Sequence, residues 1–351
     1  MTERHPAVPL QPVIDPAGWR VEDLGRPAAF TFDDGPLAEL DTALARLEKI
    51  GMPIEAMRRT DFRFVRLAKL LSDVRHQLMD GLGFACIRNF PVERYNRWRT
   101  AAAYWGLGAH LGKAVMQNAL GHMIGHERDL GHDKNDPHHR NYQTSQDTDF
   151  HAERCDIVGL LCLQPAKQGG DLRIVSSITV YNEMLKRRPD LVAEMIKPLY
   201  RDRRGEVPAG KEPWYTLPMF CFQNGYLSVR GGYLFVKSAQ RFPEVPRLTD
   251  AQVEALDLLQ AISAECHLAV RLEPGDIQFV HSHVILHART EYEDWPEPER
   301  KRHLLRLWLN TDLGFGDSAR PLTAEFAEAV QGIAVPSASP YVPLEADDGT
   351  R

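Results

Sequence analysis

The sequence has no run of eighteen consecutive apolar residues, so no segment is expected to cross a membrane as a helix. Its N-terminus lacks the apolar core of a signal peptide and is interrupted by prolines. The five cysteines are odd in number and form no Cys-x-x-Cys pair, which argues against a disulfide framework. We therefore expect a cytoplasmic protein with reduced, mostly buried thiols.

A basic stripe is also missing. The net charge is −6, with 42 lysines and arginines against 48 acidic residues, and the short basic clusters at 186–189 and 201–204 are each followed by acids. Such clusters are typical of a solvated surface, so neither nucleic acid nor a membrane is an expected partner.

No internal repeat and no convincing linker divides the 351 residues. We expect an irregular N-terminal segment at 1–35, a single domain with helical insertions at 36–333 and a flexible, proline-rich tail at 334–351. Apolar residues at helical spacing predict helices at 37–51, 62–81, 92–110 and 249–267. The first ends at Gly51, and the last opens with a capping box of Thr249 and Gln252.

From about residue 115, short runs with β propensity are separated by glycine, proline, asparagine and aspartate. Only the helix at 249–267 is expected to interrupt them. Helices first and strands afterwards predict an α+β or mainly β class. The preferred form is a double-stranded β-helix, a cupin-like jelly-roll core with flanking helices.

The segment 147–156 carries a histidine between two acids. If it is extended, His151 and Glu153 project to the same side, and so does Asp149. Two histidines and one carboxylate on one face of a metal leave positions open, which suits ferrous oxygenases, but the second histidine must come from elsewhere. The triplet alone is a weak signal and does not decide between Glu153 and Asp149.

A second stretch, 273–292, is rich in histidine. If extended from 278 to 289, it places His281, His283 and His287 on one face. Buried imidazoles need polar partners, and apolar residues would fill a core more favourably, so this pattern favours a function. The alternative is a solvated face of the strand.

The third stretch is 300–310. Alternation places Arg302 and Arg306 on one face together with Leu304 and Trp308, and the other face is apolar too, which predicts a central strand. Buried arginines need anions, and arginine suits bidentate binding of carboxylates. These anions come either from Asp or Glu side chains or from a bound ligand, and both remain open.

Taken in this order, the three stretches resemble the Fe(II)/2-oxoglutarate-dependent oxygenases of the taurine dioxygenase/TfdA-like family, over about residues 84–310. The shared features are a His-x-Glu triplet, a distant histidine before a strand and then an inward arginine. The resemblance implies that three side chains hold Fe(II): His151, Glu153 and His287. It further implies that Arg302 binds the distal carboxylate of 2-oxoglutarate, and that Arg306 helps the cosubstrate or holds an anionic group of the substrate.

The activity that the resemblance implies is an oxygenase reaction with O2 and 2-oxoglutarate. An unactivated C–H bond of a small, anionic molecule, such as an amino acid or related acid, would be oxidised. Hydroxylation is the default outcome, while desaturation and cyclisation remain open. Halogenation is disfavoured because Glu153 occupies the position that a halide would need.

The chain also departs from the family pattern. After Gly-Gly-Asp many relatives have a threonine that touches 2-oxoglutarate, whereas this chain has Leu172. His281 and His283 are surplus, and with Gly275 they nearly reproduce the first cupin motif. A cupin-type metalloprotein using these histidines is therefore an alternative, as is a non-catalytic carboxylate-binding protein on the same fold.

Further expectations concern a loop and the assembly. The loop 131–141, just before the metal triplet, is either a lid or an ordinary surface loop. A homodimer fits such scaffolds, although no residue indicates one. The sequence does not give the substrate or the regiochemistry.

Overall fold

The computed structural model describes residues 3–25, 29–132, 141–311, 320–333 and 338–346. Its centre is a seven-stranded sheet in which all pairs except β1 with β2 are antiparallel. Its order is β1 (Ala29–Thr31), β2 (Phe84–Arg88), β13 (Ile277–His281), β5 (Ile157–Gln164), β16 (His303–Asn310) and β3 (Lys113–Ala114), with β4 (Ile124–Glu127) also pairing with β16. Because β16 has neighbours on both edges and is buried on both faces, the predicted central strand is confirmed.

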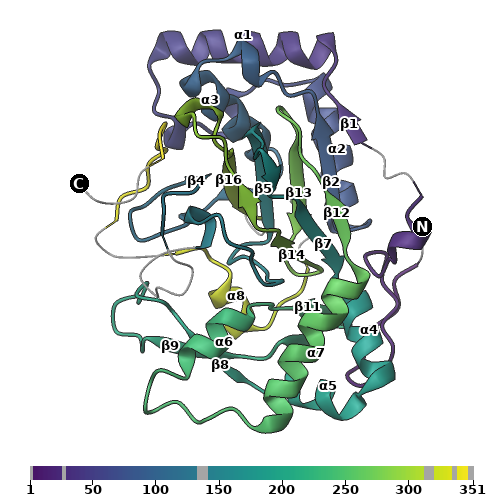
Figure 1. Ribbon diagram of the computed structural model, residues 1–351. Coiled ribbons are helices and arrows are strands. Elements are labelled where there is room, and N and C mark those ends of the chain that lie inside the picture. Colours follow the sequence, from purple (N-terminus) through teal and green to yellow (C-terminus); the bar gives the residue numbers. More distant parts are fainter. Residues whose placement is uncertain (1–2, 26–28, 133–140, 312–319, 334–337, 347–351) are drawn as a thin grey trace.

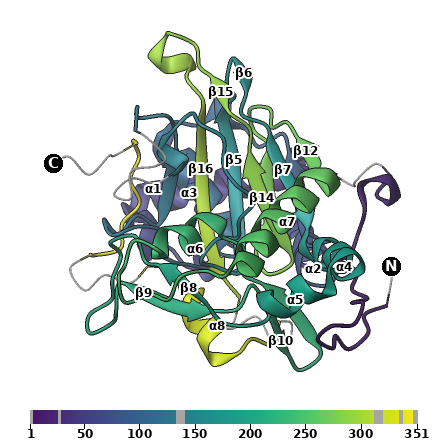
Figure 2. The ribbon, with the colours of Figure 1, turned by 60° about the horizontal axis from the view of Figure 1, so that its bottom comes forward.

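A smaller sheet stands beside the large one (Figure 1). It has three antiparallel strands, in the order β12 (Leu268–Val270), β7 (Leu172–Ser176) and β14 (Ile285–Arg289). Three two-stranded pieces complete the strands: β6 (Gln168–Gly169) with β15 (Tyr292–Glu293), β8 (Leu199–Asp202) with β9 (Trp214–Leu217), and β10 (Phe220–Gln223) with β11 (Tyr226–Val229). In Figure 2 the β6–β15 pair lies at one end of the sheets and the β8–β9 pair at the other.

The helices form two groups, at opposite ends of the view in Figure 1. The first group is α1 (Asp34–Ile50), α2 (Arg66–Met79) and α3 (Arg97–Gly108); the second is α4 (Ser177–Arg187), α5 (Pro189–Met195), α6 (Tyr233–Ala239), α7 (Asp250–Cys266) and α8 (Ala324–Ala329). None of the helices in the described ranges is both long and apolar enough to span a bilayer.

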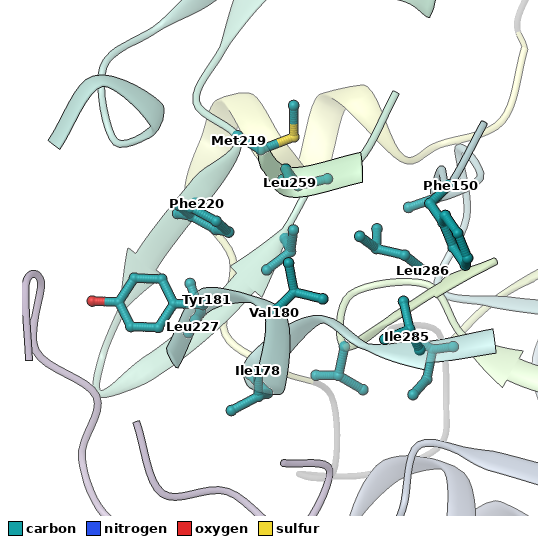
Figure 3. Packing of buried hydrophobic residues seen from close by; sticks show 14 of the residues in the cluster. Phe150, Ile178, Val180, Tyr181, Met219, Phe220, Leu227, Leu259, Ile285 and Leu286 are labelled. Carbon is teal, nitrogen blue, oxygen red and sulfur yellow. The ribbon is translucent and has the colours of Figure 1, made fainter. Parts of the chain in front are cut away.

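Alternation along the central strands divides the apolar side chains into two cores. Leu305 and Leu307 of β16 pack with the apolar faces of α1, α2 and α3. Trp308, on the other face, belongs to the core shared with the smaller sheet, α4, α5 and α7. Figure 3 shows part of this second core, where Ile285 and Leu286 of β14 lie among residues of α4, α7 and the β10–β11 pair. The second core therefore fixes the strand that carries His287.

The structure confirms the four helices that the apolar spacing predicts, with shifts at their ends. Gly51 ends α1 with a φ of 68°, in the left-handed region that favours glycine, and Thr249 and Gln252 form the predicted capping box of α7. The prediction that α7 alone interrupts the strands is wrong, because α4, α5 and α6 also lie among them. The result is a mixed α/β fold.

Two other expectations concern the stretch 278–289 and the C-terminal tail. The stretch 278–289 is not one strand: β13 ends at His281, a turn follows, and β14 begins at Ile285 in the other sheet. The part of the predicted tail that is described, 338–346, lies against the protein, because Tyr341 bridges to His122 and the carbonyl of Pro343 accepts a hydrogen bond from His126. Residues 334–337 and 347–351 of that tail are outside the described ranges.

Candidate active site

The candidate metal centre is built on a bridge between two distant segments. His151 and His287 exchange two main-chain hydrogen bonds, each of 2.9 Å from nitrogen to oxygen. His287 lies in β14, whereas His151 lies in the irregular segment before β5. This antiparallel bridge brings the two imidazoles together, with ring centroids 4.3 Å apart and ring planes inclined by 49°.

Glu153 completes a group of three. One ligand atom from each of His151, Glu153 and His287 lies within 4.8 Å of the other two, and in the described part of the chain this is the one such group of histidine, cysteine or acidic side chains. Both Nε2 atoms are 3.9 Å from Glu153 Oε1. Asp149 is not in the group; its main-chain oxygen accepts a hydrogen bond of 2.8 Å from His151 Nδ1, which leaves Nε2 of that ring available to a metal.

The protonation states of Glu153 and His287 suit metal binding. At His151 burial lowers the pKa but the Glu153 carboxylate raises it further, with a net rise, so a metal ion competes there with a proton. Burial alone would raise the pKa of Glu153, but the guanidinium of Arg306 and the neighbouring imidazoles hold it well below its ordinary value, so the carboxylate is ionised. Burial, with a contribution from His151, lowers the pKa of His287 to about 3, so that imidazole is neutral. A carboxylate and neutral imidazoles are the forms that coordinate a divalent ion.

Arg306 contacts the glutamate of this group directly. Its Nη1 donates to Glu153 Oε1 at 2.9 Å and lies 3.5 Å from Glu127 Oε1, while its Nε donates to Gln117 Oε1. The register explains the place of Glu127, because it pairs with Leu304 of β16, between Arg302 and Arg306. Of the two sources of anions that the sequence left open, protein side chains apply to Arg306: carboxylates of the protein neutralise its charge.

Arg302 is placed differently. Its side chain is only 2% exposed, yet Nη1 and Nη2 have no hydrogen-bond partner in the described ranges. Among the described residues, the nearest carboxylate oxygen is that of Glu127, 4.0 Å away, which is beyond hydrogen-bonding distance. Arg302 lines a small cavity of about 20 Å³ rather than the larger one at the metal centre, and Leu172 lines both. A buried guanidinium without an acceptor fits a site that receives a carboxylate from a ligand.

Arg230 is a residue that the sequence analysis missed. It follows β11, and its Nη1 donates to the main-chain oxygens of Ala152 and Glu153, the latter at 3.2 Å. It therefore braces the main chain of the metal triplet from the far side of the fold. No local pattern around residue 230 indicates this contact, because it depends on how β11 packs.

The cavity beside the metal centre has a volume of about 90 Å³. Its lining combines the three clustered side chains with charged and aromatic ones, including Glu127, Tyr142, Tyr233, Phe235, Arg289 and Trp308. The aromatic rings exclude water, and the charged groups offer both signs to a ligand. Of the predicted lid, residues 133–140 lie outside the described ranges.

His281 and His283 lie elsewhere. They line a separate cavity of about 190 Å³, and His283 Nε2 is hydrogen-bonded to Asp156 Oδ1 at 2.8 Å. The turn between β13 and β14 is the physical reason, because it sends His287 into the smaller sheet while His281 stays in the large one. The described residues around these two histidines form no metal-binding group of three, so the cupin alternative receives no support.

Comparison with known proteins gives matches over most of the chain. The family model described as "Taurine catabolism dioxygenase TauD, TfdA family" matches residues 46–308. FR-33289 synthase of Streptomyces rubellomurinus (strain ATCC 31215) is 33% identical over 320 residues, covering 87% of this chain and 92% of that protein. The taurine hydroxylase-like protein SAT17 of Stachybotrys chartarum (strain CBS 109288 / IBT 7711) is 26% identical over 318 residues, covering 87% and 82%.

Solved structures with the same fold include two oxygenases. The structure of asparagine oxygenase in complex with Fe(II), 2S,3S-3-hydroxyasparagine and succinate superposes with a TM-score of 0.63 at 19% identity, covering 84% of this chain and 97% of that one. The non-heme iron oxygenase OrfP in complex with Fe and alpha-ketoglutaric acid gives 0.59 at 16% identity, covering 88% and 100%. At these identities the likeness concerns the fold.

Proposed function

The chain belongs to the TauD/TfdA family of Fe(II)- and 2-oxoglutarate-dependent dioxygenases, and we propose that it oxidises an unactivated C–H bond of a small, anionic molecule such as an amino acid or related acid. The observation that carries the proposal is the convergence of His151, Glu153 and His287 at the wall of a cavity that also exposes Arg306. Hydroxylation is the default outcome; desaturation or cyclisation would use the same residues.

The metal is held by His151 Nε2, a Glu153 oxygen and His287 Nε2 in this proposal. Bound Fe(II) would supply the positions at which 2-oxoglutarate and dioxygen react, with dioxygen as the oxidant for both 2-oxoglutarate and the C–H bond. The protein fixes these three donors through the His151–His287 bridge, the Arg230 contacts to the main chain and the Arg306 contact to Glu153. Glu153 would occupy the position that a halide would need, which disfavours halogenation.

Arg302 is proposed to bind the distal carboxylate of 2-oxoglutarate. Support comes from its burial and from the two Nη atoms that lack an acceptor among the described side chains and main-chain groups. A cosubstrate carboxylate would supply the missing charge and up to two parallel hydrogen bonds. Glu127, 4.0 Å away, is near enough to keep the guanidinium ordered without satisfying it.

The substrate side is proposed to involve Arg306, Glu127 and the aromatic lining of the cavity. Arg306 and Glu127 both line the cavity, but Arg306 is already paired with Glu153 and Glu127, so a carboxylate of the substrate would have to share this guanidinium with them. The solved oxygenases with this fold bind hydroxyasparagine and hydroxyarginine, which supports an amino acid here without identifying it.

The finer architecture is also a proposal. The two sheets with a shared core favour a jelly-roll within a single domain at 36–333, preceded by the segment 1–35. The five cysteines are free, which supports a reducing, cytoplasmic setting. A homodimer stays a prediction.

A substrate screen tests the function. Enzyme loaded with Fe(II) would be given 2-oxoglutarate, oxygen and a panel of amino and other small acids, and succinate and the oxidised product would be quantified together. We expect succinate and an oxidised product in equal amounts for at least one acid. Ligand binding without any succinate would instead favour the non-catalytic carboxylate-binding alternative.

A further inference from the structure

Two buried arginines share one aromatic ring next to the metal centre. The guanidinium carbons of Arg289 and Arg302 lie 4.9 and 5.1 Å from the centroid of the Tyr292 ring. Arg289 is 4% exposed and Arg302 2%. Like charges buried around one ring raise the free energy of the fold unless an anion accompanies them.

The polar atoms around this ring lack acceptors. Within the described ranges, no hydrogen-bond partner exists for Arg302 Nη1 and Nη2, for Arg289 Nε or for the Tyr292 hydroxyl. In the part of the chain that the structure describes, the acceptor of Arg289 Nη2 is the main-chain oxygen of Gln146, which is uncharged. Glu127, Asp129 and Asp294 act on these groups through their charges, but none of these carboxylates accepts a hydrogen bond from the unpaired donors. Several buried donors in one place without a bonded acceptor favour an anionic ligand.

The strand register puts Arg289 at the boundary between the two cavities. Arg289 lies directly opposite Leu172 in the pair of β14 with β7, so their side chains are neighbours on one face. Leu172 lines both the metal-site cavity and the small cavity of Arg302, and Arg289 lines the metal-site cavity. Arg289 is also two residues from His287 in the same strand, so it points to the same side.

We propose that Arg289 is a second arginine for the distal carboxylate of 2-oxoglutarate, acting together with Arg302 and the Tyr292 hydroxyl. The inference rests on the proposed function of the site. A carboxylate has enough lone pairs to accept from both guanidiniums and the phenol. Arg289 thereby provides the hydrogen bond that apolar Leu172 cannot, and the site is selective for oxo acids with two carboxylates.

A purely structural role for Arg289 makes a different prediction. Its main-chain N–H donates to Thr148 Oγ1, and its Nη2 contact to Gln146 braces the segment before the metal triplet. If bracing were its whole role, its loss would weaken every ligand of the site alike. A ligand without the distal carboxylate therefore distinguishes a binding role of Arg289 from a purely bracing role.

The experiment compares two oxo acids on the full-length, Fe(II)-loaded protein under anaerobic conditions, with calorimetry as the readout. One is 2-oxoglutarate, and the other is 2-oxopentanoate, in which a methyl group replaces the distal carboxylate. The variants are Arg289→Gln and Arg289→Lys. The second keeps the positive charge at the buried position and changes only the hydrogen-bonding geometry. Arg300→Lys is the control, since that arginine is about half exposed and stacks on Trp295.

We expect Arg289→Gln to weaken the binding of 2-oxoglutarate about 10- to 100-fold, as loss of a charged hydrogen bond does. The affinity for 2-oxopentanoate should stay within about twofold of the wild-type value. Arg289→Lys should fall between, and Arg300→Lys should match the wild type. Equal losses for both acids, or none for 2-oxoglutarate, would overturn the role of Arg289. If the wild-type protein bound neither acid, the proposed function itself would fail, which is a distinct result.

Discussion

His151 and His287 pair through two reciprocal main-chain hydrogen bonds, although one lies in an irregular segment and the other in a strand of the smaller sheet. The pair sets the distance between the two imidazoles before any metal arrives. Since Leu286 and Ile285 anchor β14 in the second core, the geometry of the metal centre depends on that core as well as on its own side chains.

Replacement of a proposed iron ligand should abolish metal binding without unfolding the chain. His287→Ala or Glu153→Ala removes one of three donors, and we expect Fe(II) affinity to fall by at least about 100-fold, more than loss of an outer-shell partner costs. Metal titration followed by calorimetry measures this, with circular dichroism to check folding. His76→Ala, an exposed histidine of α2 outside the group, serves as the control; unchanged Fe(II) affinity in the ligand variants would contradict the assignment.

Gly170→Ala should weaken the binding of 2-oxoglutarate by displacing the side chain of Arg302. Gly170 has a φ of +73°, and an added Cβ would lie 3.1 Å from Arg302 Nε, so the buried guanidinium would have to move. We expect 2-oxoglutarate affinity to fall about tenfold with Fe(II) binding unchanged. Gly210→Ala is a matched control, because its φ is +72° and its Cβ would meet nothing within 4 Å; an equal loss there would attribute the effect to backbone strain alone.

Acid should remove a contribution of Asp156 to stability. Burial alone would raise the pKa of Asp156, but the hydrogen bond from His283 and bonds from Thr311 lower it below its ordinary value. A depressed carboxyl pKa stabilises the fold above the unfolded value of about 3.9, and this contribution is lost as the pH falls through the folded pKa. Asp156→Asn should therefore destabilise the protein by about 1–3 kcal/mol at pH 7, measured by urea unfolding.

The same comparison at lower pH tests the sign of the pH dependence of this stability difference. The difference between wild type and Asp156→Asn should shrink as the pH is lowered below about 4. Asp190→Asn, which removes an exposed partner of Arg188, should change little at any pH. A difference that stays constant with pH would show that Asp156 contributes through packing.

Core packing behind the metal centre is tested by Leu286→Ala. Leu286 is fully buried beside His287, so truncation should cost about 2–5 kcal/mol in the free energy of unfolding. Leu120→Ala, at a site 41% exposed, should cost far less. Equal effects in chemical unfolding would contradict the packing described for β14.

The sequence was informative where chemistry and order coincide. His151-x-Glu153, His287 and Arg302 stand in the sequence order of one family pattern, and the structure brings the first three of these side chains together. Alternation along 302–308 correctly predicted a buried central strand. The sheet change between His281 and His287 was missed because a period of two looks the same on either side of a turn at 282–284. Arg230 and Arg289 act through contacts between distant elements, and no local pattern encodes such contacts.

The most direct test of the account is an anaerobic titration of the Fe(II)-loaded protein with 2-oxoglutarate, followed by the weak visible metal-to-ligand absorption band. We predict one iron per chain and a band that saturates with 2-oxoglutarate in the wild type but is absent in Glu153→Ala. A folded wild-type protein that binds iron yet gives no 2-oxoglutarate-dependent band, or a band that persists in Glu153→Ala, would contradict the claim that His151, Glu153 and His287 hold the catalytic iron.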